Sequence, residues 1–253
     1  MTIGHRILGE GSEKVIVVHG WTSDHTVFAP MFPALDLKTY SYAFIDYRGY
    51  GASREIAGKF TLDEICADAV ALADHLGWER FHIVGHSQGG KAVQLIAARN
   101  PKRVKSVIAL TAVPASGVPL EGQQRALFEG AADEANNRAI IIDVTTGNRL
   151  SRTWINALVE KSLDVCRRDA FAAYFHAWAD GDLSAEVKGC TVPLKAVVGE
   201  HDVAITADVM KATVLQWFPG SELEVMANAG HYPMQETPIR LATVWEEWFA
   251  RHG

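Results

Sequence analysis

Short runs of apolar and β-branched residues recur along the chain, and segments with a helical pattern separate them. The first strong run is Lys14–Val18, and similar runs follow at residues 42–45, 81–84, 107–110, 194–198 and, more weakly, 223–226. Continuous apolar runs of this length are typical of strands that are buried on both faces of a sheet. The pattern therefore predicts a mostly parallel sheet that is covered by helices on both sides.

The segments between these runs carry signals for helix ends. Thr61–Glu64 forms a capping-box sequence, which predicts a helix that runs to Leu76 and stops at Gly77. Residues 91–99 have a helix-forming composition, and Pro238 suits the first turn of a last helix that continues to Arg251.

One long segment, residues 114–189, breaks this alternation. Helical patterns cover residues 123–135, 153–164 and 168–178, and the apolar run 139–142 is ambiguous. We expect a core domain made of residues 1–113 and 190–253, with residues 114–189 folding as a helical cap over the carboxyl edge of the sheet. The alternative is a set of ordinary crossover helices.

Composition narrows the functional classes. The 253 residues are 48% apolar and 21% charged, and the net charge of −6 offers no basic face for nucleic acid. No apolar stretch approaches the roughly 20 residues that cross a bilayer, and the N-terminus lacks a signal-peptide layout. The three cysteines are scattered without metal-type spacing. We expect a cytoplasmic protein that binds neither nucleic acid nor membrane.

The segment 85–90 has the sequence Gly-His-Ser-Gln-Gly-Gly, directly after one predicted strand and directly before a helix. A G-x-S-x-G motif in this context is typical of a sharp turn that exposes a nucleophilic serine, here Ser87. Larger side chains at Gly85 and Gly89 would collide in so tight a turn, and Gly90 lets the helix approach the strand. A plain glycine-rich turn is the alternative.

An acyl-transfer site also needs two N–H donors for the developing oxyanion. The residue after the nucleophile, Gln88, supplies one backbone N–H at the start of a helix. The segment His19-Gly20-Trp21 ends the first strong strand, and the backbone N–H of Trp21 is the natural second donor. We expect His19 itself to have a structural role.

A general base and an acid complete the predicted site. His231 follows the last predicted strand and precedes the last helix, so it lies at the same sheet edge as the serine. Asp202 lies just beyond the strand before it, with Glu200 as the local alternative. No carboxylate is present at residues 111–113, which follow the 107–110 strand. The chain order Ser87, Asp202, His231 is that of a Ser-Asp-His triad.

Other chemistry finds little support in the sequence. There is no H-E-x-x-H, no phosphate-binding G-x-x-x-x-G-K and no G-x-G-x-x-G at a first strand, so we expect neither a metal nor a cofactor. The glycine-rich segment 46–53 has the wrong spacing for a dinucleotide and is interpreted as a turn. The candidates for contact with a small-molecule substrate are His86, Trp154, Phe171, Tyr174, Phe175, Trp178 and Tyr232.

Taken together, the segments 19–21, 46–53, 85–89, 199–202 and 230–231 resemble the signature segments of the α/β-hydrolase superfamily. The chain looks most like its cofactor-free esterase and haloperoxidase-like branch. The resemblance implies an eight-stranded, mostly parallel sheet with a helical cap after the sixth strand, and the triad and oxyanion roles given above. Val203 stands where many relatives have proline. The serine at position 87 disfavours dehalogenases and epoxide hydrolases, which carry a nucleophilic aspartate there.

These features predict hydrolysis of a carboxylic ester or lactone of a small apolar or aromatic substrate through an acyl-enzyme. Two enzymatic alternatives remain, because fold alone does not choose a chemistry. Residues 20–25 also resemble cofactor-free dioxygenases that use the His/Asp pair as a base, and carbon–carbon bond hydrolases share the scaffold. A hydrolase-like ligand receptor with little turnover is the non-enzymatic alternative. The sequence is silent on oligomeric state.

Overall fold

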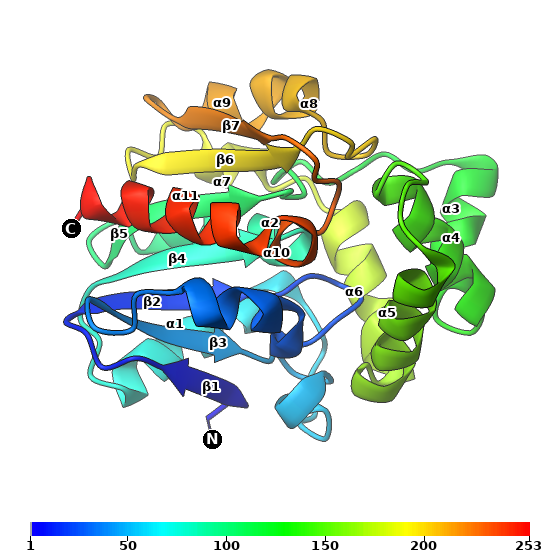
Figure 1. Cartoon of the computed structure of the whole chain (residues 1–253), viewed down its shortest axis with the longest axis horizontal. Coiled ribbons are helices and arrows are strands. Elements are labelled where there is room, and N and C mark those ends of the chain that lie inside the picture. The colour runs from blue at the N-terminus through cyan, green and yellow to red at the C-terminus, as the bar shows by residue number, and fades with distance from the viewer. Residues whose placement is uncertain (1) are drawn as a thin grey trace.

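A seven-stranded sheet in the order β1-β3-β2-β4-β5-β6-β7 forms the centre of the computed structural model, which describes residues 2–253 (Figure 1). β1 pairs antiparallel with β3, and every other pair of neighbouring strands is parallel. Each predicted strand is present. The strands are β1 (His5–Leu8), β2 (Glu13–Val18), β3 (Tyr40–Ile45), β4 (Phe81–His86), β5 (Val104–Leu110), β6 (Leu194–Gly199) and β7 (Glu222–Met226).

The sheet of the described residues has seven strands, whereas eight were expected. A single strand, β1, precedes β2 and forms the edge beside β3. Residues 2–4 add no further strand, because they run against the turn after β3, where the Gly4 N–H donates to Ser53 Oγ at 2.6 Å. The four-helix insertion therefore follows the fifth strand in chain order and not the sixth, because the sheet has one strand fewer than expected.

Alternate side chains of the strands face two separate apolar cores. Ile16 and Ile83 belong to one core, and Val17 and Val84 belong to the other, as the two-residue period of a strand requires. The capping box that was predicted at Thr61–Glu64 is present. The first face is covered by α1 (Leu62–His75), α2 (Gln88–Arg99), α8 (Ala207–Ala212) and α9 (Val214–Trp217). The second is covered by η1 (His25–Ala34), α10 (Pro233–Glu236) and α11 (Pro238–Ala250).

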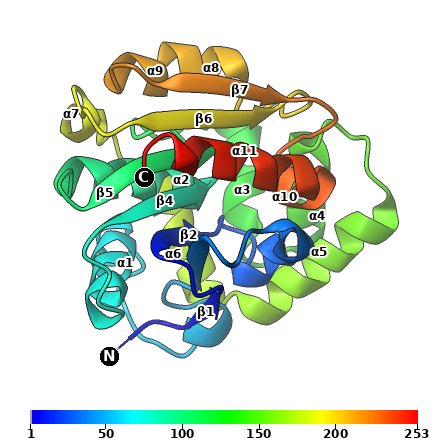
Figure 2. The same ribbon diagram turned by 60° about the vertical axis from the view of Figure 1, so that its left-hand side comes forward.

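Four helices between β5 and β6 gather beyond the carboxyl ends of the strands, where Figures 1 and 2 show them as one group. They are α3 (Gly122–Gly130), α4 (Ala135–Thr145), α5 (Arg152–Val165) and α6 (Arg168–Ala179). We call these four helices the cap. The ambiguous run 139–142 lies within α4, so it is helical. The short helix α7 (Ser184–Val187) packs against α2 instead.

A buried lysine joins the cap to the core. Lys91 lies on α2 with no exposed surface, and its Nζ donates to the carbonyls of Trp178, at 3.0 Å, and Gly181. Burial lowers the pKa of Lys91 to about 8, although Asp180 and Asp182 favour its charge. These bonds hold the end of α6 against the helix that follows Ser87.

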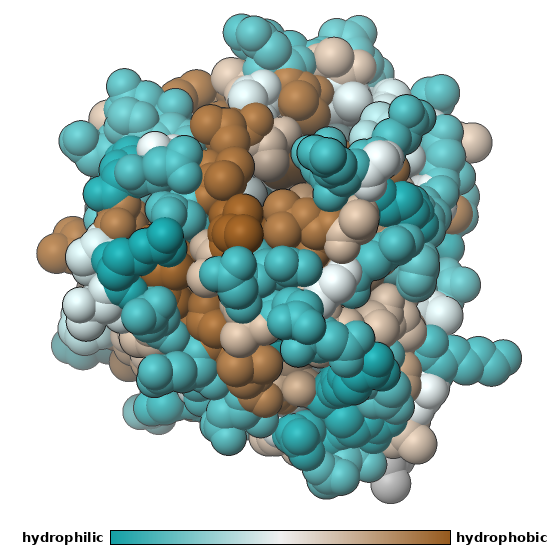
Figure 3. All heavy atoms as spheres, turned by 90° about the vertical axis from the view of Figure 1, so that its right-hand side faces the viewer, coloured by the Kyte–Doolittle hydropathy of each residue, from teal (hydrophilic) through white to brown (hydrophobic). Residues whose placement is uncertain are grey.

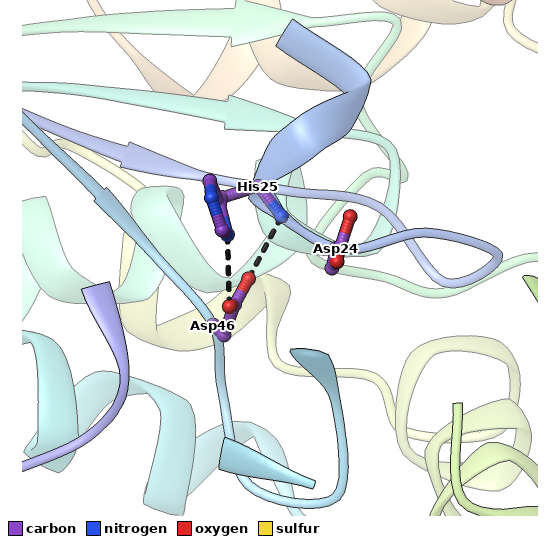
Figure 4. Close-up of side chains that lie close together, drawn as sticks. All are labelled: Asp24, His25 and Asp46. Atoms are coloured by element: carbon purple, nitrogen blue, oxygen red, sulfur yellow. Dashed lines mark hydrogen bonds and ion pairs between the residues drawn. The ribbon is translucent and has the colours of Figure 1, made fainter. Parts of the chain in front are cut away.

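A pair of a half-buried histidine and a buried aspartate joins the loop after β2 to the loop after β3 (Figure 4). Asp46 is fully buried and accepts hydrogen bonds from the His25 N–H at 2.8 Å, from His25 Nδ1 at 2.8 Å and from the Ala52 N–H at 2.9 Å. Burial disfavours both charges, but the mutual hydrogen bond raises the pKa of His25 and lowers the pKa of Asp46. The pair therefore fixes the segment that leads from β2 into η1.

Replacing Lys91 by methionine is expected to weaken the attachment of the cap. The change leaves two carbonyls without their donor, which should lower the free energy of unfolding by about 2 kcal/mol. Urea denaturation followed by tryptophan fluorescence measures this loss. Lys211→Met is the control, because Lys211 is exposed on α8 and its one ion pair within residues 2–253 is with Asp208. Equal stability of the two variants would contradict the role of Lys91.

The His25–Asp46 pair predicts a stability difference that depends on pH. The contribution of Asp46 is present above its ordinary pKa of about 3.9 and is lost as the pH falls through its lowered value. The contribution of His25 is present below about 6.5 and is lost as the pH rises through its raised value. Asp46→Asn should therefore cost about 2 kcal/mol, and most between about pH 4 and 6.5.

Urea unfolding of wild type and Asp46→Asn at pH 5.5 and pH 9 measures this difference. Asp208→Asn serves as the exposed control. A loss of the same size at both pH values would show that the ionic part of the pair contributes nothing.

Candidate active site

Ser87 occupies a strained turn between β4 and α2. Its backbone has φ +53° and ψ −116°, a combination that residues with side chains rarely adopt. A Cβ at Gly85 would collide with the Gly89 carbonyl, and one at Gly90 would collide with the side chain of Ala112. A Cβ at Gly89 would come within 2.5 Å of the His19 carbonyl oxygen. The glycines of the motif are thus required by close packing, and the turn lifts Ser87 above the end of the strand.

His231 and Asp202 meet from the loops after β7 and β6. His231 Nδ1 donates to Asp202 Oδ2 at 2.7 Å, which leaves Nε2 as the acceptor nitrogen of a neutral ring. Asp202 Oδ1 accepts the N–H groups of Ala204 at 2.9 Å and Ile205 at 3.0 Å. The alternative acid, Glu200, is exposed and accepts the Asn228 N–H at 3.0 Å.

The backbone of His231 is held from three sides. Its carbonyl accepts His86 Nε2–H at 2.8 Å and the Thr111 hydroxyl at 3.1 Å, and its N–H donates to the Thr145 carbonyl at 3.2 Å. Thr111 has φ +38°, which is costly for a β-branched residue. Burial keeps the pKa of His86 well below its ordinary value, so this ring is neutral. Both His86 and Thr111 therefore orient the loop that carries His231.

The Trp21 N–H is directed by the carbonyl of the same peptide unit. The Gly20 carbonyl accepts His19 Nδ1–H at 2.8 Å and the Tyr47 hydroxyl at 2.7 Å, so it points into the core. In a planar trans peptide the N–H points the opposite way, toward the cavity that Trp21 lines. His19 thus acts on the loop through the Gly20 carbonyl, in line with the structural role expected for it.

The Gln88 N–H is directed in the same manner. The Ser87 carbonyl accepts the N–H groups of Gly90 at 2.9 Å, Lys91 at 3.3 Å and Val113 at 3.0 Å. The Gln88 N–H belongs to the same peptide unit as this carbonyl, so it points in the opposite direction, at the first turn of α2. Within residues 2–253, the Trp21 and Gln88 N–H groups have no acceptor, as donors kept for a bound oxyanion require.

A cavity of about 220 Å³ lies between the carboxyl edge of the sheet and the cap, and both Ser87 and His231 line it. Its wall is mostly apolar. The other lining residues are Trp21, Thr22, His86, Val113, Val118, Leu120, Gln124, Phe128, Ile141, Thr145, Trp178, Val203, Ala204, Ile205 and Tyr232.

Three of the seven substrate-contact candidates, His86, Trp178 and Tyr232, line this cavity. The other four lie behind its wall, which differs from the expectation. Phe171 and Phe175 pack on Trp21, with ring centroids 4.0 and 5.8 Å away.

The remaining two candidates are held by other contacts. Tyr174 packs against Tyr47 and donates to the Arg48 carbonyl at 3.2 Å. Trp154 contacts Tyr232 edge-on, with ring centroids 5.7 Å apart. These positions follow from which face each helix turns to the core, which a helical pattern alone does not specify.

Several lining residues have no motif that could mark them in the sequence. Val118, Leu120 and Phe128 come from the start of the cap, and Ile141 and Thr145 come from one face of α4. Only Thr22 and residues 203–205 could have been suggested, because they adjoin the predicted oxyanion loop and the predicted acid.

One group of three side chains with metal-ligating atoms comes together in residues 2–253, namely Asp24, His25 and Asp46 (Figure 4). The Asp46 oxygens already accept three donors, as described above. Asp24 Oδ1 accepts the N–H and hydroxyl of Thr26, and Oδ2 lies 3.4 Å from Lys161 Nζ. The donor set is therefore engaged by the chain itself.

Within the same residues no helix is long and apolar enough to cross a membrane.

Two curated proteins illustrate the sequence similarity. The first is the dihydrolipoyllysine-residue acetyltransferase component of the acetoin cleaving system of Pseudomonas putida, 26% identical over 92% of this chain. The chain spans 64% of that relative's length. The second is 2-hydroxy-6-oxononadienedioate/2-hydroxy-6-oxononatrienedioate hydrolase 2 of Pseudomonas putida. It is 24% identical over 90% of this chain and 85% of its own.

The fold is also shared with solved structures. An esterase from Exiguobacterium antarcticum superposes with a TM-score of 0.85 at 19% identity, over 97% of this chain and 94% of its own. At this identity the likeness shows a shared fold.

Residues 14–140 match the family model described as the alpha/beta hydrolase fold. The segment 14–140 is half of the chain and includes the Ser87 turn, so this protein belongs to the α/β-hydrolase family, as its motifs predicted.

Proposed function

We propose that this protein is a serine hydrolase that cleaves a carboxylic ester or lactone through an acyl-enzyme. The observation that carries the proposal is a convergence on one cavity. A serine on a strained strand-to-helix turn, an imidazole with an acceptor nitrogen and Trp21, whose N–H has no acceptor, all line it. The Gln88 N–H, directly after the serine, has no acceptor either. This set of groups is what nucleophilic acyl transfer needs.

In the proposed reaction His231 Nε2 takes the proton of the Ser87 hydroxyl while Ser87 Oγ attacks the substrate carbonyl. The Trp21 and Gln88 N–H groups bind the oxyanion that forms, and Asp202 stabilises the imidazolium through Nδ1. His231 then gives the proton to the leaving oxygen. A water molecule activated by the same imidazole attacks the acyl group and releases Ser87.

Ser87 Oγ and His231 Nε2 form no hydrogen bond in the described part of the chain. Such catalytic contacts are often long in a substrate-free site and shorten when the substrate binds. The positions of Asp202, His86 and Thr111 restrict His231 to a small range of movement, which supports its role as the base.

A second candidate is hydrolysis of a carbon–carbon bond, and the similarity to the Pseudomonas putida dienedioate hydrolase favours it. That chemistry also requires a carbonyl bound near Ser87. Covalent labelling of Ser87 by a fluorophosphonate tests the nucleophile in both cases. Oxygen uptake with oxo-heteroaromatic substrates tests the dioxygenase alternative, which does not require the serine.

Ser87→Ala is expected to lower the turnover of a p-nitrophenyl ester by more than about 10⁴-fold, because it removes the nucleophile. Circular dichroism and the midpoint of urea unfolding should be unchanged. The control is Ser116→Ala, a half-buried serine outside the cavity lining. Undiminished turnover in Ser87→Ala would overturn the mechanism.

Thr111→Val is expected to lower kcat about tenfold with little change in KM. The substitution keeps the shape of the side chain and removes the hydroxyl that holds the His231 carbonyl. Thr111→Ser retains the hydroxyl and should restore turnover. Steady-state kinetics across pH distinguish a displaced base from a folding defect, because the pH dependence of ester cleavage depends on the protonation of the base. A fully active Thr111→Val would show that the hydroxyl does not position His231.

A further inference from the structure

We propose that the cavity accepts only uncharged substrates whose acyl part is a small apolar chain or a single ring, and that it rejects acyl groups that carry a carboxylate. This inference rests on the proposed hydrolase function and names its substrate class. It also distinguishes this chain from the similar Pseudomonas putida hydrolase, whose name indicates that it acts on dicarboxylates.

The wall of the cavity contains no lysine, arginine, aspartate or glutamate among the described residues. Its polar side chains are hydroxyls, one amide and two histidines. His86 is neutral because burial keeps its pKa well below the ordinary value, and His231 is needed as the base. A substrate carboxylate would therefore lose its water without gaining a cation, which is strongly unfavourable.

Two buried cations behind this wall, Lys91 and Arg138, are engaged by other groups of the chain. Lys91 Nζ faces the carbonyls of Trp178 and Gly181. Arg138 is buried in α4, where its guanidinium lies 3.9 Å from the ring centroid of Phe171. Its Nε donates to the Ala131 carbonyl at 2.7 Å, and Nη1 donates to Ser162 Oγ at 2.8 Å. Neither side chain can turn toward the cavity without breaking buried hydrogen bonds.

The charge that does lie close to the site is negative. Asp202 is buried against His231, and its carboxylate has no cationic partner among the described residues other than the ring that it orients. A second carboxylate in the cavity would be repelled through a medium of low dielectric constant. The field at the site therefore adds to the desolvation cost of an anionic substrate.

Three aromatic rings define the acyl end of the cavity. Trp21, Phe128 and Trp178 all line it, and their ring centroids lie 5.5 to 6.0 Å apart. His231 must reach both Ser87 and the leaving oxygen, so the leaving group lies on the His231 side. The acyl group then extends toward the oxyanion donor Trp21 and against this aromatic cluster, where an apolar chain or a ring packs well.

The volume limits the size of this acyl part. A protein cavity of about 150 Å³ holds benzene, with six carbon atoms. By that proportion the 220 Å³ measured here hold about nine non-hydrogen atoms. A carbonyl that carries one short chain or one ring fills this space, and the leaving group extends beyond it.

The approach to the cavity is apolar as well. Figure 3 shows a band of hydrophobic side chains between polar ones on the face that carries the cap. Val203, at the cavity wall, is 58% exposed, and Ile140 and Val144 on α4 are also exposed. Val203 thus adds an exposed apolar side chain at the edge of the cavity, where a charged group gains no partner.

The test compares two esters of equal shape. p-Nitrophenyl 4-methylpentanoate and p-nitrophenyl hydrogen succinate have the same number and branching of acyl heavy atoms, but the second ends in a carboxylate. We expect kcat/KM to be more than about tenfold higher for the neutral ester, since an unpaired charge would enter the cavity. A ratio of tenfold or less would overturn the proposal.

A charge added at the rim shows whether charge or shape causes the discrimination. Gln124 lines the cavity and is exposed, so Gln124→Lys places an ammonium at the rim without burying it. We expect kcat/KM for the succinate ester to rise about two- to fivefold relative to Gln124→Met. The neutral ester is measured with both variants, so that any effect of losing the Gln124 amide cancels in the ratio between the two esters. An unchanged ratio between the two esters would contradict discrimination by charge.

A binding measurement tests the preference for uncharged ligands even if the protein does not hydrolyse esters. Ser87→Ala retains the cavity, and thermal shifts with 4-methylpentanamide and with succinamate compare a neutral ligand and an anion of the same shape. We expect stabilisation by the amide alone. Stabilisation by succinamate as large as that by the amide would overturn the proposal. Absent Ser87 labelling would instead overturn the hydrolase function.

Discussion

The rest of the site depends on one backbone constraint, the passage from strand to helix within a single residue at Ser87. That passage requires a left-handed backbone at Ser87 and leaves no room for side chains at the glycines around it. The same turn aims the Ser87 carbonyl at the Val113 N–H and leaves the Gln88 N–H without an acceptor among residues 2–253. Nucleophile and oxyanion donor are thus consequences of one geometry, which is why they can be anticipated together.

The proposed second donor, Trp21, and the proposed base, His231, are placed by hydrogen bonds to backbone carbonyls. The Gly20 carbonyl is held by His19 and Tyr47, and the His231 carbonyl is held by His86 and Thr111. Each buried polar side chain acts on the peptide unit next to a functional group and not on the reacting atoms. Buried donors of this kind fix an orientation because leaving them unpaired is costly.

The sequence predicts the parts of this protein that depend on local physics. The strand runs, the capping box at Thr61 and the turn at Ser87 can be recognised because each has a short-range cause. The edge strand β1 has half-exposed side chains and a polar start, so it lacks the apolar signal of the others. The conformation of Thr111 could not be anticipated, because a β-branched residue gives no sign that it will adopt a positive φ.

On α6, Phe171, Tyr174 and Phe175 form a helical stripe that packs toward Trp21 and Tyr47. Of the residues on α6, only Trp178 at its end lines the cavity.

The bond from the His231 N–H to the Thr145 carbonyl has a further consequence. Thr145 is the last residue of α4, so the cap supplies one of the contacts that hold the loop of the base. The cap and the core are therefore not independent modules. A change in where or how α4 ends would also remove or move a contact of the loop that carries His231. The walls of the cavity and the position of the imidazole are in this way linked through a single main-chain oxygen.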